Sequence, residues 1–188
     1  MIAITQRKQK LTLNDFLALP ETKPAQEYFN GDITTKPMPQ GQHSMIQTYL
    51  AETINQVARK QKIALALTEL RCTFGDRSLV PDIAVFEWHR IPRDEKGKIA
   101  NRINTYPDWI IEILSPEQPA NQVIKKIIFT IEEGAKLGWL IAPQDESVMI
   151  FQPNQFPQIK SGKDNLTVLE IINDWHLSVK EIFEWLNL

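Results

Sequence analysis

The sequence has little of what marks secreted or membrane proteins. Its 188 residues include one cysteine, Cys72, so no disulfide can form within the chain, and a reducing compartment is expected. Cys72 lies in a strand-like run, where a small buried thiol is the usual role. No apolar run reaches the length of a membrane-spanning helix, and residues 1–10 lack the apolar core of a signal peptide. We therefore expect a cytoplasmic protein with no membrane partner.

Positive charge is not in excess either. The 21 Lys and Arg residues are outnumbered by 23 Asp and Glu, which gives a formal net charge of -2. Proteins that grip nucleic acid mainly through its phosphates are usually basic overall, so any such contact must use a local patch. The one concentrated basic stretch is 88–102. It is either a solvated surface loop or a flap that steers phosphate groups toward a neighbouring site.

Several common signatures of function are missing. The chain has no Gly-rich phosphate loop, no Cys/His metal cluster, no low-complexity tract and no internal repeat. Its hydrophobic content of 43% and charged content of 23% are globular averages, which excludes wholesale disorder. We expect one domain over 1–188, with a core at about 12–172 and a final helix at about 178–188.

Hydrophobic periodicity and turn residues predict an α/β chain. Helices are predicted from a capping box at Thr12 through Leu19, over 44–62, over 119–133, and after a second capping box at Ser178. Asn30-Gly31 is the strongest hairpin signal in the chain. Strand-like runs lie at 63–74, 79–86, 109–116, 138–142, 147–151, 156–159 and 166–171.

The runs at 79–86 and 109–116 each carry one acid, Asp82 and Glu112, where apolar residues are otherwise the rule. A carboxylate among core residues is costly unless it is paired, so two on neighbouring strands indicate a shared cation. Alternatively, each acid lies in water at a frayed strand end. The strand, helix and strand over 109–142 form a βαβ-like crossover. This arrangement puts Glu112 at the carboxyl end of its strand, where open α/β sheets place their sites.

Two further residues are candidates with an equally ordinary alternative. Glu27 precedes the Asn30-Gly31 turn and is either a third site carboxylate or a solvent-facing strand residue. His43 opens the helix at 44–62, where its ring is either a packed or capping group or points into a cleft.

These features together resemble a known family. In order, they are Glu27-Tyr-Phe-Asn-Gly31, His43 at a helix start, Val80-Pro-Asp-Ile-Ala-Val85, Ile111-Glu-Ile-Leu-Ser-Pro116, Lys126 and Gly134-Ala-Lys-Leu-Gly-Trp-Leu-Ile141. Each motif is short and common, but their order and spacing resemble the Uma family of restriction-endonuclease-like proteins, which is bacterial and abundant in cyanobacteria. The resemblance covers nearly the whole chain.

The resemblance implies a PD-(D/E)XK nuclease fold (α/β, in the α+β sense), with a central mixed β-sheet flanked by helices. It implies Mg²⁺ or Mn²⁺ as cofactor, held by Asp82, Glu112 and the backbone carbonyl of Ile113. Glu27 would add a carboxylate or hold a water, and Lys126 would orient or help deprotonate the attacking water. Lys125 is about 100° away around the helix, so both lysines are not expected to face the site.

The chain departs from the wider pattern in three places. Leu114 stands where these nucleases carry lysine, and the family supplies that amine from the next helix, at the position of Lys126. One turn earlier, Gln122 replaces a frequent Asp that would orient the lysine, and Thr130 replaces a usual Tyr. These changes bear on activity more than on the fold.

The sequence supports two functions. The leading one is a divalent-metal-dependent endonuclease that hydrolyses phosphodiester bonds, with DNA as the expected partner. The alternative is a non-catalytic module that binds nucleic acid or protein on a degenerate nuclease fold. The five tryptophans leave room for an apolar interface, and nucleases that cut both strands commonly act as a homodimer.

Overall fold

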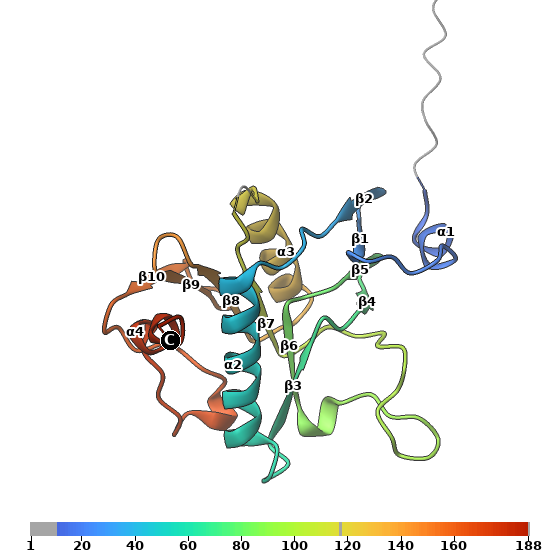
Figure 1. The fold of residues 1–188 in the computed structure, drawn as a ribbon. Coiled ribbons are helices and arrows are strands. Elements are labelled where there is room, and N and C mark those ends of the chain that lie inside the picture. The colour runs from blue at the N-terminus through green and yellow to red at the C-terminus, as the bar shows by residue number, and fades with distance from the viewer. Residues whose placement is uncertain (1–10, 117, 188) are drawn as a thin grey trace, which may run out of the picture.

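A computed structural model describes residues 11–116 and 118–187, and these residues form two β-sheets with helices packed against them (Figure 1). The larger sheet has six strands in the order β10-β9-β8-β7-β6-β3, and the smaller has four in the order β2-β1-β5-β4. The prediction for residues 1–10 lies outside the described part, and the single domain over 1–188 stays a prediction.

The elements have the following bounds. The strands are β1 (Gln26–Phe29), β2 (Asp32–Thr35), β3 (Ala64–Thr68), β4 (Cys72–Phe74), β5 (Arg77–Leu79), β6 (Ile83–Glu87), β7 (Trp109–Ile113), β8 (Leu137–Ala142), β9 (Ser147–Phe151) and β10 (Gln158–Ser161). The helices are α1 (Leu13–Leu17), α2 (Gly41–Ala58), α3 (Ala120–Glu132) and α4 (Val179–Glu184), with 3-10 turns η1 (Trp88–Arg90) and η2 (Glu170–Ile172).

The six-stranded sheet is mixed and lies between helices, as predicted. Helices α2 and α4 cover one face through a core that includes Ile54, Trp109 and Ile182. Helix α3 covers the other face, where Ile127 packs with Ile110. In Figure 1, α2 crosses in front of the strands of this sheet, and the small sheet and α1 lie to one side. The fold is therefore the α+β arrangement expected from the sequence.

The β7-α3-β8 segment is the predicted crossover. Strands β7 and β8 pair in parallel, with Glu112 opposite Leu140. Gly138 in β8 allows α3 to approach closely, because a Cβ there would overlap a methyl group of Ile127. Strand β9 then returns antiparallel to β8, also as predicted. This crossover fixes Glu112 near the start of α3.

Helix α2 confirms the predicted amphipathic pattern. Ile46, Leu50, Ile54 and Ala58 recur at i, i+4 spacing and are fully buried. The helix begins at Gly41, earlier than predicted, so His43 lies within its first turn.

The N-terminal hairpin also forms. Asn30 and Gly31 have φ values of 54° and 87°, the left-handed region that a tight two-residue turn requires. The turn joins β1 to β2, and β1 pairs on its other side with β5 through Tyr28 and Ser78. Both predicted capping boxes are present, at Thr12 and at Ser178. The hairpin carries Glu27 on β1 toward the large sheet.

Some predicted bounds are wrong. Helix α1 ends at Leu17 instead of Leu19, and the run at 63–74 is two strands, because Glu69 turns the chain with a φ of 50°. The predicted strand at 166–171 is absent, and the backbone there ends in the 3-10 turn η2. Leu166 and Leu169 pack into the core. Their burial gives the sequence a strand-like apolar pattern, although this segment pairs with no strand of the described residues.

Of the two alternatives for 88–102, the phosphate-steering flap is wrong, and most of the stretch is a solvated surface loop. The stretch leaves β6 after Glu87 and returns toward β7, which begins at Trp109. Because β6 and β7 are antiparallel, this loop lies at the end of the two strands opposite to Asp82 and Glu112. Its Arg90 instead contacts Asp108, with 2.8 Å between Nη1 and Oδ1.

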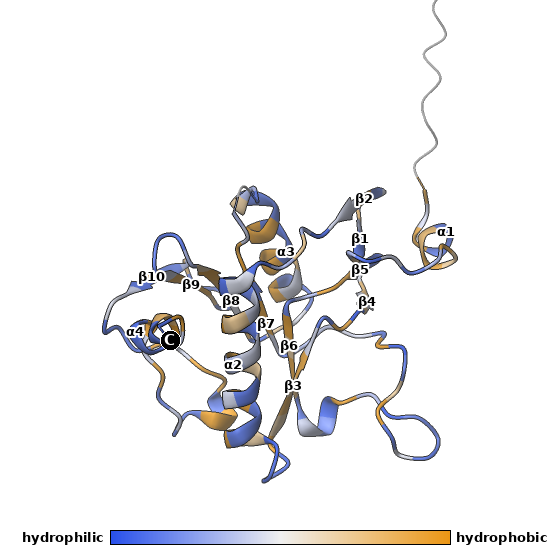
Figure 2. Cartoon of the chain, viewed as in Figure 1, coloured by the Kyte–Doolittle hydropathy of each residue, from blue (hydrophilic) through white to orange (hydrophobic). Residues whose placement is uncertain are grey.

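The polarity of the chain follows the layers. Figure 2 shows apolar colour concentrated on the strands of the large sheet and hydrophilic colour in the loops. Cys72 is fully buried, as predicted, and burial raises the pKa of its thiol to about 12. Within the described residues, no helix is long and apolar enough to cross a membrane.

Candidate active site

Asp82 and Glu112 lie side by side at one end of the large sheet. Asp82 was predicted to lie inside a strand, but it immediately precedes β6. Glu112 is the fourth residue of β7. Ile83 pairs with Ile111, and this antiparallel register places Asp82 level with Glu112. Both side chains are almost completely buried. The alternative of acids in water at frayed strand ends is therefore wrong.

Asp82 is held by three different elements. Its Oδ2 accepts a hydrogen bond from the backbone N–H of Ile113 at 2.7 Å and lies 3.2 Å from Nε2 of His43. Its Oδ1 accepts a hydrogen bond from Nζ of Lys36 at 2.7 Å. Burial alone would raise the pKa of Asp82, but the contacts with His43 and Lys36 hold it well below its usual range. Asp82 is thus an ionised carboxylate.

Glu112 is paired with Lys126 of α3. Nζ of Lys126 lies 2.8 Å from Oε1 of Glu112, yet this oxygen has no partner with hydrogen-bond geometry among the described residues. Desolvation raises the pKa of Glu112 to about 8, although Lys126 opposes the shift. Burial would lower the pKa of Lys126, but the neighbouring Glu112 and Glu27 raise it. Lys126 is therefore an ammonium group, and burial favours the protonated form of Glu112 over the ionised one.

The small sheet delivers the third carboxylate. Oε1 of Glu27 contacts Nζ of Lys126 and accepts a hydrogen bond from the backbone N–H of Val80 at 2.6 Å. The carbonyl oxygen of Val80 also accepts hydrogen bonds from both lysines, from Nζ of Lys36 at 2.8 Å and from Nζ of Lys126 at 3.2 Å. The solvent-facing alternative for Glu27 is therefore wrong, and the hairpin brings this residue to the end of the large sheet.

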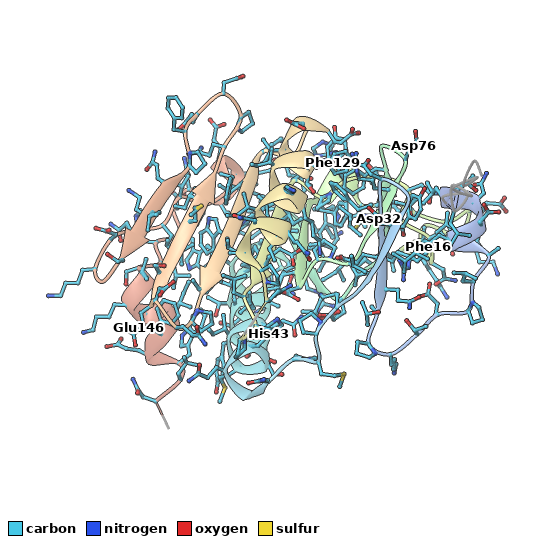
Figure 3. The ribbon with its side chains drawn as sticks, turned by 90° about the horizontal axis from the view of Figure 1, so that it is seen from above. Phe16, Asp32, His43, Asp76, Phe129 and Glu146 are labelled. Atoms are coloured by element: carbon cyan, nitrogen blue, oxygen red, sulfur yellow. The ribbon has the colours of Figure 1, made fainter. Side chains whose placement is uncertain are left out.

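The other predicted residues lie around these groups. His43 is buried on the first turn of α2, and Figure 3 shows it at the end of that helix seen from above. Gln122 lines the adjoining cavity, and so does Lys125, although it was expected to face away. Of the two lysines of α3, Lys126 is the one that contacts acids within the described part of the chain.

Sequence reasoning missed three residues: Lys36, Gln47 and Glu69. Lys36 follows β2 and contacts Asp82, as well as Glu69 at 3.2 Å. Nε2 of Gln47 donates to Oε1 of Glu69 at 3.0 Å and to the backbone carbonyl of Asp82 at 2.8 Å. These residues come from three separate segments with no motif, so only the tertiary fold reveals them. We call Glu27, Lys36, Glu69, Asp82, Glu112 and Lys126 the acid–lysine site.

Two cavities open onto the acid–lysine site. One, of about 350 Å³, is lined by Glu27, Glu112 and Lys126, together with Phe29 and Thr34 of the hairpin. The other, of about 580 Å³, is lined by Asp82, His43 and Glu69. Lys36, Pro37, Glu112 and Gln118 line both cavities. A ligand in either space would therefore reach the carboxylates.

The donor types fit a hard divalent cation. Mg²⁺ and Mn²⁺ prefer carboxylate and carbonyl oxygens, and the site holds four carboxylates against two lysines. Oε1 of Glu112 is a buried oxygen without a hydrogen bond. However, within 11–116 and 118–187 no three His, Cys, Asp or Glu side chains are arranged to hold one metal ion. The acids instead face the ammonium groups of Lys36 and Lys126, which supply the positive charge at the site.

Comparison with known proteins gives the family. The profile of the Uma2 family, described as "Putative restriction endonuclease", matches residues 13–180. The chain belongs to the Uma2 family. A search of the curated proteins finds no match.

A solved structure supports the Uma2 assignment. The chain is similar to the protein described as "a putative nuclease belonging to DUF820 from Anabaena variabilis ATCC 29413". The two share 48% identity with a TM-score of 0.92, over 94% of this chain and 99% of that one. The predicted family and fold class are thereby confirmed.

The departures from the wider nuclease pattern have clear positions in this Uma2 chain. Leu114 packs against the apolar cluster of Ile110, Val123 and Ile127 beside α3. Thr130 is buried, and its Oγ1 donates to the carbonyl of Lys126 at 2.8 Å, so it reaches the helix backbone instead of the site. The lysine amine at Glu112 is therefore supplied by Lys126 alone among the described residues.

Proposed function

We propose that this Uma2 chain is a divalent-metal-dependent endonuclease that hydrolyses phosphodiester bonds in DNA. The observation that carries the proposal is the buried Glu112 beside Lys126 at the wall of two cavities, level with the ionised Asp82. Perturbed acids next to a specific cation in a cleft are typical of catalytic sites. Membership of a family described as "Putative restriction endonuclease" supports the same reaction.

The residues have distinct roles in this proposal. Asp82, Glu112 and the carbonyl of Ile113 would hold Mg²⁺ or Mn²⁺, which supplies charge neutralisation at the phosphoryl oxygens and lowers the pKa of an attacking water. Lys126 orients the water and offsets the charge that develops on the phosphate. Glu27 holds the Lys126 ammonium in place through their contact. His43 and the N–H of Ile113 fix the orientation of the Asp82 carboxylate.

A second candidate is a non-catalytic module that binds nucleic acid or protein. The observation in its favour is that both oxygens of Asp82 already have partners from the protein itself, Lys36, His43 and Ile113. Gln122, in place of an acid at the cavity wall, also weakens the case for catalysis. The homodimer and the cytoplasmic location stay predictions under either function.

The test is cleavage by purified protein of supercoiled plasmid, linear duplex, single-stranded DNA and RNA, each with Mg²⁺, Mn²⁺ or EDTA. Wild type is compared with Glu112→Gln, which keeps the shape and removes the carboxyl group, and with Lys136→Gln, a control at the opposite end of β6. We expect metal-dependent cleavage of DNA that falls at least about 100-fold in Glu112→Gln and is unchanged in the control. Equal activity in Glu112→Gln, or no cleavage of any substrate, would contradict the proposal.

A further inference from the structure

Lys36 is the least expected member of the acid–lysine site. It follows β2 directly, and its backbone N–H donates to the carbonyl of Ala25 at 2.9 Å, which anchors the start of the side chain. Its Nζ lies 2.7 Å from Oδ1 of Asp82 and 3.2 Å from both oxygens of Glu69. The side chain is 11% exposed. One ammonium group thus bridges a buried acid and an acid nearer the surface.

Lys36 is also the only one of the three recorded partners of the Asp82 carboxylate that can leave without moving a structural element. The N–H of Ile113 belongs to β7, and the ring of His43 is buried on α2. Lys36 has a flexible four-carbon stem and lines both cavities. A cation that uses Oδ1 of Asp82 must therefore take the place of the Lys36 ammonium, because two positive groups cannot share that position without strong repulsion.

Glu69 offers the displaced ammonium a second position. Its side chain is 44% exposed, so an ion pair there needs little further desolvation. The carboxylate is already oriented toward the site, since Gln47 donates to Oε1 at 3.0 Å and the backbone N–H of Glu69 donates to the carbonyl of Asp82 at 3.2 Å. Lys36 can therefore lose Asp82 and keep a charged partner.

We propose that Lys36 is a built-in counter-ion of the acid–lysine site: its ammonium occupies the cation position on Asp82 and moves onto Glu69 when a divalent cation binds. The proposal rests on the metal site of the proposed function. It agrees with the finding that no three acidic side chains converge among the described residues, because the Lys36 ammonium lies between Asp82 and Glu69. It also makes the strength of cation binding depend on a residue that is not a ligand.

The first test is calorimetric titration of metal-stripped protein with Mn²⁺, on wild type, Lys36→Gln and Lys125→Gln. Lys125 lines the neighbouring cavity and contacts no acid within 11–116 and 118–187, so its substitution removes the same charge without removing a competitor. We expect Lys36→Gln to bind Mn²⁺ about tenfold more tightly than wild type, and Lys125→Gln to change affinity by about twofold or less. Equal affinity in the two variants, or weaker binding by Lys36→Gln, would overturn the proposal.

A second readout uses wild type and so does not depend on the variant folding. Lysines are methylated with formaldehyde and a mild reductant, with and without saturating Mg²⁺, and each peptide is quantified by mass spectrometry. Methylation of Lys36 should rise severalfold with Mg²⁺, while that of Lys136 stays constant. Unchanged or reduced methylation of Lys36 would overturn the proposal. If wild type binds no Mn²⁺ or Mg²⁺, the proposed function fails and this inference with it; if wild type binds but Lys36 does not respond, only this inference fails.

Discussion

The two ends of strands β6 and β7 carry charged clusters of different character. At one end is the acid–lysine site. At the other, Asp108 accepts a hydrogen bond from the N–H of Glu87 at 2.9 Å, contacts Arg90, and lies near Lys136, whose Nζ is 2.5 Å from Glu87. We call these four residues the Asp108 cluster. It has two acids and two cations, whereas the acid–lysine site has four acids and two lysines.

Burial alone does not separate the two clusters. Asp108 is fully buried, and its Oδ1, like Oε1 of Glu112, has a close cation but no hydrogen-bond partner among the described residues. The difference lies in charge and access. Lys136 is 53% exposed, and the two cavities beside the acid–lysine site are lined by none of the Asp108 cluster. A balanced cluster ties a loop to strand ends, whereas a surplus of carboxyl groups beside a cavity is suited to hold a cation.

The largest effect should follow the loss of Lys126. Lys126→Met leaves Glu27 and Glu112 without their ammonium partner, and we expect DNA cleavage to fall by about 10²–10⁴-fold. The free energy of unfolding should fall by about 3–5 kcal/mol in urea titrations, since a buried charge loses its partner. Adding Glu112→Gln to this variant should recover part of the stability and none of the activity. A stable, active Lys126→Met protein would remove this lysine from the site.

Asp108→Asn should separate stability from function. The amide keeps the shape but weakens the contacts with Arg90 and Lys136, so we expect a loss of about 1–3 kcal/mol in the free energy of unfolding. Mn²⁺ affinity, measured by calorimetry on the folded variant, should match that of wild type. A large loss of metal binding in Asp108→Asn would mean that the two clusters are coupled and that our distinction between them is wrong.

The acid–lysine site should make the stability of the protein depend on pH, through Glu112. Burial raises the pKa of Glu112 from its ordinary value of 4.5 to about 8, so between these values the folded state keeps a proton that the unfolded state has lost. This contribution to stability is complete below about pH 4.5 and is lost as the pH rises toward 8. Without metal, the wild type should therefore lose stability relative to Glu112→Gln from pH 5 to pH 8. Parallel pH profiles in urea unfolding would contradict the shift.

Lys136→Met should have the smallest effect. Its ammonium is half exposed, so water can take its place beside the buried Glu87, and we expect the pair to contribute about 1 kcal/mol. We expect a change of that size in thermal unfolding, with no change in DNA cleavage. A loss comparable to that of Lys126→Met would show that exposure does not explain the contrast between the two lysines.

The parts of the fold that the sequence predicted are those with strong local patterns. The i, i+4 spacing of Ile46, Leu50 and Ile54 determined α2, and the Asn30-Gly31 turn determined the hairpin. The parallel pairing of β7 with β8 followed from the strand, helix and strand order. Leu166 and Leu169 are buried because a loop packs on the core, not because they lie in a sheet. Their apolar pattern therefore predicted a strand that does not exist.

The site was predictable only in part, for a related reason. Asp82 and Glu112 stand out because charged residues are rare in apolar runs, whereas Lys126 was expected only from the family resemblance. Lys36 and Glu69 are ordinary loop residues in sequence, and their roles depend on the tertiary contact between the β2–α2 segment and the start of β6. The sequence could not show that the basic stretch at 88–102 lies far from the acids. Its position depends on the antiparallel pairing of β6 and β7, which cannot be inferred from local composition.

The most direct test of a cation site at this end of the sheet is calorimetric titration with Mn²⁺ of metal-stripped wild type, Glu112→Gln and Asp108→Asn at pH 8, with circular dichroism to confirm that each is folded. We predict that wild type and Asp108→Asn bind Mn²⁺ and that Glu112→Gln does not. Binding that is lost in Asp108→Asn and kept in Glu112→Gln would place the cation at the opposite end of the sheet. Absence of binding in all three, repeated with a phosphodiester oligomer present, would contradict the metal-dependent nuclease and favour the non-catalytic module.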